Sequence, residues 1–389
     1  MVTTVDVAGV EAVLRGDAAL LEDDLAAFLD SLTGAPTQEG GPGAETSAYD
    51  AALRCSLYEP VADAVGSKVG QEALPPAAGA PGGRGAPLRP SMVFWAYRNY
   101  RGFPDESGDD ADLAVVRRTA VAVRILLKAA VALDDVQDGS VVRYGEAALH
   151  VTHGVPLALN TGAWLITAAL RHAADPAVVD SLVRSVGNGF TGQAVDMSTR
   201  SARTRAELMA APGDARVDFW ESMAALKTGT LFWMPLDAAV AGLRVVDHER
   251  RTLDDAMRRL GLASQLFNDL TDFVPELGGA NVHEDFDGLS NRVFLELLDG
   301  SDTEMSGTEM SGTEMSGTEM QSFVLGHPRL QDTLLTLSAE AVELKRAAKN
   351  AVHGVCRSER SAAYFDMTIE RKGHLIDRLH RTVRQRSGA

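Results

Sequence analysis

The sequence predicts an all-α protein in which long helices form a bundle around a central apolar cavity. Two observations support this class: Ala, Leu and Val recur at three- and four-residue spacing over long segments, and alternating apolar–polar runs bounded by turn residues are nearly absent. Long helices with strong apolar faces bury those faces against one another. The expected helical segments lie near residues 8–33, 48–69, 111–138, 156–173, 176–199, 216–242, 248–273, 330–356 and 360–386.

The composition restricts the partners. The chain has 389 residues, 54 acidic against 37 basic, and a formal net charge of −17, which disfavours nucleic acid and anionic membrane surfaces because phosphates are repelled. No apolar stretch reaches the ~18 residues of a membrane span, and no secretory signal is visible at the N-terminus. The two cysteines, Cys55 and Cys356, are far apart and fit a reducing compartment. A cytoplasmic protein is expected.

Low-complexity segments suggest the domain organisation. Residues 34–47 and 72–87 are rich in Gly, Pro and Ala and are typical of linkers, so residues 1–84 are expected to form an N-terminal helical extension. Residues 85–389 are expected to form the main domain. Within it, residues 301–320 are four tandem pentapeptides, SDTEM and three copies of SGTEM, which contain too little apolar area to order themselves. This segment is predicted to be a disordered surface insertion.

A first acidic cluster follows an apolar helix. Asp134, Asp135 and Asp138 lie in ALDDVQDGS, and Asp134 and Asp138 share a helix face because they are four residues apart. Close carboxylates disfavour one another's ionised form unless a cation is present. Their hard oxygen ligands suit Mg²⁺, which typically takes one or two carboxylates and keeps other positions for substrate phosphate and water. A solvated acidic helix end is the competing interpretation.

A second acidic cluster lies in GLASQLFNDLTDF. Gln265, Asn268, Asp269 and Asp272 fall at i, i+3, i+4 and i+7, which is one stripe of a helix. Burying several carboxylates without a counter-charge is costly. The two clusters are therefore expected to be facing walls of one site that holds several metal ions.

The residues resemble the trans-isoprenyl diphosphate synthases, the polyprenyl synthetase family of class I isoprenoid enzymes, over roughly residues 85–300. Asp134-Asp135-x-x-Asp138 is similar to the family's first aspartate-rich motif, and Asn268-Asp269-x-x-Asp272 is similar to the second with Asn in its first position. Four further pieces occur in the family's order. They are Leu88-Arg89-Pro90 for the end of GKRLRP, Arg143 for the first Arg of RRG, Gly192-Gln193-x-x-Asp196 for GQxxD, and Lys227-Thr228 for the Lys-Thr pair.

The resemblance implies the class I isoprenoid synthase bundle, a homodimer, and an allylic prenyl diphosphate substrate held by three Mg²⁺ ions. The implied metal ligands are Asp134, Asp135, Asp138, Asn268, Asp269 and Asp272. The implied substrate-binding residues are Arg89, Arg143, Gln193, Lys227, Thr228 and Gln265. The implied catalytic residues are Asp134, Asp135, Asp138, Lys227 and Asp269. Metal ions and cations favour ionisation of an allylic C–O bond because they neutralise the charge on the departing diphosphate.

Departures from the family pattern concentrate in one place. The resemblance implies a second diphosphate pocket, for isopentenyl diphosphate, but Ala86 replaces its Lys, Tyr144 its second Arg and Leu127 its His, while Arg89 is kept. Each lost charge-assisted hydrogen bond is worth ~1.5–3 kcal/mol. The expected reaction is therefore ionisation of an allylic diphosphate, followed by transfer of the cation to another acceptor or by cyclisation.

Three alternatives stay open beside transfer to another acceptor: a terpene cyclase that uses geranylgeranyl diphosphate, an ordinary chain-elongating synthase, and a non-catalytic regulatory subunit. The cyclase is favoured by the similarity of residues 268–276 to NDxxSxxxE, although Pro275 would disturb the helix before Glu276. Small residues at Ala129 and Ala130 fit a substrate of C15–C20 or longer. Aromatic residues that either line the pocket or pack in the core are Trp164, Phe190, Trp220, Phe232, Trp233 and Phe267.

Overall fold

The computed structural model describes residues 6–33, 47–66, 88–106, 110–143, 145–274, 277, 286, 288–298 and 317–388. In these residues, the secondary structure is helical apart from one short β-hairpin. The predicted all-α class is therefore confirmed. Within the described residues, no helix is both long and apolar enough to cross a membrane. The chain divides into two compact units, of which the first is Met1–Val183, Met234–Asp247 and Cys356–Arg371, and the second is Arg184–Trp233, His248–Val355 and Lys372–Ala389.

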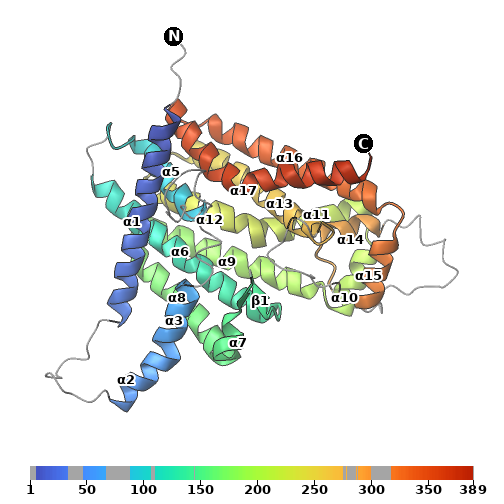
Figure 1. Ribbon diagram of the computed structural model, residues 1–389, viewed down its shortest axis with the longest axis horizontal. Helices are drawn as coiled ribbons and strands as arrows, with labels where there is room; N and C mark the ends of the chain where they lie inside the picture. Colours follow the sequence, from blue (N-terminus) through green and yellow to red (C-terminus); the bar gives the residue numbers. More distant parts are fainter. Residues whose placement is uncertain are drawn as a thin grey trace, which may run out of the picture. The chain divides into compact units, whose positions relative to one another are not determined.

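The first unit is built around α6, which packs along α8 and beside α5 (Figure 1). Leu126, Leu133 and Leu165 are among the buried residues of α6 and α8. The chain enters the second unit within α9. The elements are α1 (Val7–Thr33), α2 (Ala48–Leu53), the π-helical turn η1 (Arg54–Tyr58), α3 (Glu59–Gly66), α5 (Leu88–Arg101), α6 (Asp110–Gln137), β1 (Val142–Arg143), β2 (Glu146–Ala147), α7 (Leu149–His153), α8 (Val155–Ala173) and α9 (Pro176–Ser198).

The first helix, α1, is an integral part of this unit. Its apolar residues Val10, Leu14, Leu21, Leu25 and Phe28 recur at three-, four- and seven-residue intervals and are all buried. The amphipathic helix predicted for residues 8–33 is confirmed, and α1 contacts α5 and α6. The division of the chain at residue 84 stays a prediction.

The second unit gathers apolar residues of α13, α14, α16 and the C-terminal part of α17 into one core. Leu266 and Leu270 of α13, Phe294 of α14, Leu337 of α16 and Leu379 of α17 are all buried there. This core supports the end of α13, where the second acidic cluster lies. The remaining elements are α10 (Ala202–Ala210), α11 (Gly213–Ala224), the π-helical turn η2 (Ala225–Gly229), α12 (Thr230–Gly242), α13 (Asp247–Thr271), α14 (Arg292–Leu297), α15 (Gly317–Gly326), α16 (Leu330–His353) and α17 (Glu359–Arg386).

Helical structure begins inside the repeat segment, which differs from the prediction. The insertion was expected to cover residues 301–320, but α15 begins at Gly317, and Met320 of the last repeat is fully buried in the second unit's core. One methionine side chain is large enough to anchor a helical turn when a core is available to receive it. Residues 301–316 and the linker residues 34–46 and 67–87 lie outside the described residues.

Candidate active site

The first acidic cluster lies where α6 ends in the first unit. Gly139 has φ +67°, and the N–H groups of Gly139 and Ser140 donate to the carbonyls of Val136 and Asp135, at 3.4 and 2.9 Å. These two bonds form a Schellman motif, which uses a glycine in the left-handed conformation to satisfy the last carbonyls of a helix. The helix therefore stops directly after the acidic cluster, and the chain turns back.

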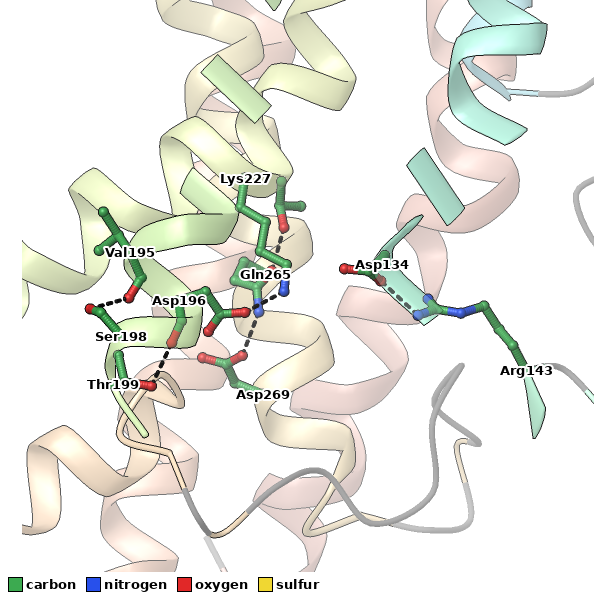
Figure 2. A network of polar contacts seen from close by, with 10 residues as sticks. Asp134, Arg143, Val195, Asp196, Ser198, Thr199, Lys227, Gln265 and Asp269 are labelled. Atoms are coloured by element: carbon green, nitrogen blue, oxygen red, sulfur yellow. Dashed lines mark hydrogen bonds and ion pairs between the residues drawn. The ribbon is translucent and has the colours of Figure 1, made fainter. Parts of the chain in front are cut away.

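The reversed chain carries Arg143 to this cluster on β1. The Arg143 guanidinium donates to Asp134 with 2.6 Å between Nη2 and Oδ2 (Figure 2). Its Nε donates to Asp135. Burial lowers the pKa of Arg143, but the charges of Asp134 and Asp135 and their hydrogen bonds outweigh this effect and raise it above its ordinary value. One cation thus bridges two neighbouring carboxylates.

The other predicted residues of the first unit lie near the ends of helices. Asp138 follows the last residue of α6, and its N–H still donates to the Asp134 carbonyl at 2.8 Å, so the four-residue register continues to that point. Arg89 lies in the first turn of α5 and is half-buried. Asp134 and Asp138 are also half-buried, whereas the Asp135 side chain is 1% exposed.

In the second unit, Asp269 of α13 is the centre of a hydrogen-bonding network. Its Oδ1 accepts from Gln265 Nε2 at 2.8 Å, and its Oδ2 accepts from Trp220 Nε1 at 2.9 Å and from the Arg292 backbone N–H at 2.8 Å. Figure 2 shows Gln265 directed at Asp269, and Thr228 donates in turn to Gln265. The structure therefore joins Thr228, Gln265 and Asp269, which are 37 and 4 residues apart in the sequence, into one chain of side chains.

Asp272 departs from the predicted helical stripe. The helix α13 ends at Thr271, and Asp272 lies in a turn in which Phe273 and Val274 donate to carbonyls three residues back. Pro275 explains the early end, because the residue before a proline disfavours the helical conformation. Asn268 remains on the helix and its side chain is exposed. Pro275 and Glu276 lie outside the described residues.

Asn291 fixes the end of α13 against the start of α14. Its Nδ2 donates to the Asp269 carbonyl at 3.1 Å and to Asp272 Oδ2 at 3.2 Å, while its Oδ1 accepts from Val293 N–H at 2.8 Å and caps α14. The side chain of this one capping residue thus holds the backbone carbonyl of Asp269 and the carboxylate of Asp272.

The Lys227-Thr228 pair lies in η2, between α11 and α12. Such π-helical turns inside longer helices occur often at functional sites. Lys227 pairs with Asp196 of α9, the last residue of the Gly192-Gln193-x-x-Asp196 motif (Figure 2). A Cβ atom on Gly192 would lie 2.4 Å from the backbone nitrogen of Lys227, so only glycine allows α9 to approach η2 this closely. Gln193, the residue after Gly192, is also buried.

Several predicted residues lie outside the description or play a different role. Ala86 and Tyr144 lie outside the described residues, and Leu127 is buried in α6. Phe190, considered as a pocket residue, is 47% exposed. Trp220 is fully buried in the second unit's core and donates a hydrogen bond to the Asp269 carboxylate.

Three residues that order the second cluster were not predicted for this role: Trp220, Asn291 and Arg292. Asp196 was identified only as the last residue of the Gly192-Gln193-x-x-Asp196 motif, and its pairing with Lys227 was not predicted. The sequence offers one signal for Trp220, since a buried indole N–H requires an acceptor. No local pattern identifies that acceptor, because Asp269 is 49 residues further along the chain.

The two clusters suit magnesium by their chemistry. Within the described residues, no three His, Cys, Asp or Glu side chains are grouped closely enough to hold a metal ion. Mg²⁺ does not require such a group, because it is commonly bound by one or two carboxylates together with substrate phosphates and water. Asp134, Asp135 and Asp269 offer hard carboxylate oxygens, so the donor set fits this ion.

The Polyprenyl synthetase family model matches residues 78–288, which is more than half of the chain. The chain belongs to the polyprenyl synthetase family, as its motifs predicted.

Two curated relatives and one solved structure illustrate the likeness. The chain is 29% identical to fusoxypene synthase of Fusarium oxysporum, in a match that covers 44% of this chain and 24% of that protein. It is 28% identical to the prenyl transferase paxC of Penicillium paxilli, in a match that covers 42% of this chain and 48% of that protein. These matches therefore cover a quarter to a half of the relatives' lengths. The geranylgeranyl pyrophosphate synthetase of Geoglobus acetivorans matches with a TM-score of 0.60 at 17% identity, over 95% of this chain and 99% of that one, and this supports the fold.

Proposed function

We propose that this protein is a Mg²⁺-dependent prenyltransferase that ionises an allylic prenyl diphosphate and directs the cation to an acceptor other than isopentenyl diphosphate, or into a ring. The observation that carries the proposal is the pair of ordered carboxylate clusters, one bridged by Arg143 and one built around Asp269. Membership of the polyprenyl synthetase family supports it.

The proposal assigns a metal-binding role to each of the two clusters. Three Mg²⁺ ions would be held by Asp134, Asp135, Asp138, Asn268, Asp269 and Asp272. When bound, magnesium neutralises the negative charge that develops on the departing diphosphate. The diphosphate itself would contact Arg143 and Lys227. Both cations are paired with carboxylates, and they place positive charge within a strongly acidic chain.

The eroded acceptor pocket sets this chain apart from an elongating synthase. Ala86, Tyr144 and Leu127 stand where the family resemblance implies a Lys, an Arg and a His, and none of the three provides a cation. Loss of two or three charge-assisted hydrogen bonds, at about 1.5–3 kcal/mol each, lowers the affinity for a second diphosphate by several powers of ten. Arg89 alone does not replace them.

Cyclisation is the second candidate, and two observations favour it. Asn268 stands at the first position of the second motif, as in NDxxSxxxE, and a relative carries the name of a terpene-type synthase, fusoxypene synthase. Small side chains at Ala129 and Ala130, the first of them fully buried, support a substrate of C15–C20 or longer. The remaining alternatives, an ordinary elongating synthase and a non-catalytic subunit, are less consistent with a lost acceptor pocket and a retained ionisation site.

The proposal includes a homodimer. Val155 and Leu159 are four residues apart on α8 and are 45% and 41% exposed. Two large apolar side chains on one helix face are costly in water and favour burial by another protein surface. A second copy of this chain fits the family resemblance. The exposed apolar face of α8 supports it.

Diphosphate release tests the proposed ionisation. The purified protein, incubated with Mg²⁺ and farnesyl or geranylgeranyl diphosphate, is expected to release diphosphate, and a chelator is expected to stop the release. Hydrocarbon or terpene alcohol from the substrate alone, identified by mass spectrometry, indicates cyclisation. Release that begins only when an acceptor is added indicates transfer. Absence of Mg²⁺-dependent release from every C10–C25 allylic substrate, with and without an acceptor, would contradict the proposal and favour a non-catalytic subunit.

A further inference from the structure

The fully buried Trp220 donates its indole N–H to the carboxylate of Asp269. Among the described residues, no other fully buried tryptophan donates to a side-chain carboxylate. The ring is 0% exposed, and the Nε1–Oδ2 distance of 2.9 Å is that of an ordinary hydrogen bond. Asp269 is 4% exposed. A carboxylate at this depth takes its hydrogen bonds from protein donors, because solvent does not reach it.

The two oxygens of Asp269 carry different hydrogen bonds. Oδ2 accepts from Trp220 Nε1 and from the Arg292 backbone N–H, so two donors occupy its two lone pairs. Oδ1 accepts from Gln265. The donors on Oδ2 fix the rotation of the carboxylate about its Cβ–Cγ bond. This arrangement presents Oδ1, and not Oδ2, as the oxygen that would bind a metal ion.

Arg292 holds the indole in this orientation. Its guanidinium carbon lies 5.7 Å from the centre of the Trp220 ring, within the range of a cation–π contact, and its Nη2 pairs with Glu296 at 2.7 Å. Its Nε and Nη1 are buried and make no hydrogen bond within the described part of the chain. A cation over the ring polarises the indole N–H and strengthens it as a donor.

We propose that Trp220 is a positioning residue for magnesium: its indole N–H occupies Oδ2 of Asp269, so that Oδ1 is turned to the metal. The inference rests on the proposed function, since it supposes that Asp269 is a metal ligand. Trp220 itself touches neither metal nor substrate. A supporting role of this kind is typical of the residues that orient metal ligands, and loss of such a partner commonly lowers metal affinity 10- to 100-fold.

The test measures metal binding without turnover. Mg²⁺ is titrated calorimetrically into the full-length protein in the presence of inorganic pyrophosphate, for the wild type and for Trp220→Phe. This substitution removes the N–H and keeps an aromatic ring. We expect the Mg²⁺ affinity to fall about 10- to 100-fold. If Trp220→Phe does not fold, incorporation of the benzothienyl analogue of tryptophan at position 220 keeps the ring size and removes the N–H.

Trp95→Phe is the matched control. Trp95 is also fully buried, and its Nε1 donates to the Ser361 carbonyl at 2.9 Å in the other unit. This variant loses an equivalent hydrogen bond and stability but is expected to keep its Mg²⁺ affinity within about twofold of the wild type. Equal weakening in both variants, or wild-type affinity in Trp220→Phe, would overturn the positioning role. Absence of Mg²⁺ binding in the wild type would overturn the proposed function itself, and this inference with it.

Discussion

Replacement of Asp269 by Asn is expected to lower Mg²⁺-dependent diphosphate release by at least about a thousandfold, because it removes the proposed metal ligand from the centre of the second cluster. The amide also brings its own N–H groups to a position where Gln265, Trp220 and the Arg292 backbone already donate. At least one buried donor then loses its acceptor. The rate of diphosphate release from geranylgeranyl diphosphate at saturating Mg²⁺ is the measurement.

Asp255→Asn is the control for this variant. Asp255 lies on the same helix, is exposed, and pairs with Arg259 one turn away at 2.7 Å. An exposed pair of this kind contributes little to stability, so the rate is expected to stay within about twofold of the wild type. Retention of more than about a tenth of the wild-type rate in Asp269→Asn would show that Asp269 is not essential to ionisation.

Replacement of Asp17 by Ala is expected to lower the free energy of unfolding by about 3–5 kcal/mol, because it leaves Arg98 as a buried charge without its partner. Asp17 of α1 accepts from Arg98 Nε of α5 at 3.1 Å and from the Tyr364 hydroxyl of α17 at 3.1 Å. Its side chain is 2% exposed, and that of Arg98 is 6% exposed. Burial raises the pKa of the Asp17 carboxyl, although Arg98 and Tyr364 act in the opposite direction.

Urea unfolding measures this loss as a shift of the transition midpoint at a constant slope. The exposed neighbour Asp23, on the same helix, provides the control, and Asp23→Ala is expected to change stability by no more than about 0.5 kcal/mol. If Asp17→Ala unfolds at the same urea concentration as Asp23→Ala, the buried network does not hold α1 in the first unit.

The long helices could be predicted from the sequence because their signal is local. The segments expected at 8–33, 176–199 and 248–273 correspond to α1, α9 and α13 with boundaries that differ by two residues or fewer. Each is long enough for the three- and four-residue spacing of apolar positions to repeat many times. Short helices such as α14, with six residues, contain too few repeats and were not predicted.

In the candidate site, too, the local features could be predicted from the sequence and the long-range contacts could not. The spacing of Gln265, Asn268 and Asp269 on one helix is visible in the sequence, whereas the donors that order Asp269 come from residues 49 positions before it and 23 after it. Arg143 was predicted to bind diphosphate, and the structure adds its pairing with Asp134 and Asp135, which depends on the Schellman turn at Gly139. Contacts of this kind arise from tertiary packing and leave no local pattern.

The most direct test of the central claim is a comparison of products formed from geranylgeranyl diphosphate and Mg²⁺ with and without isopentenyl diphosphate, identified by mass spectrometry. The claim is that allylic ionisation is retained while the isopentenyl diphosphate pocket is lost. The expected result is diphosphate release at the same rate in both reactions, with no diphosphate product extended by five carbons. Formation of the extended diphosphate as the main product would contradict the claim and identify an ordinary chain-elongating synthase.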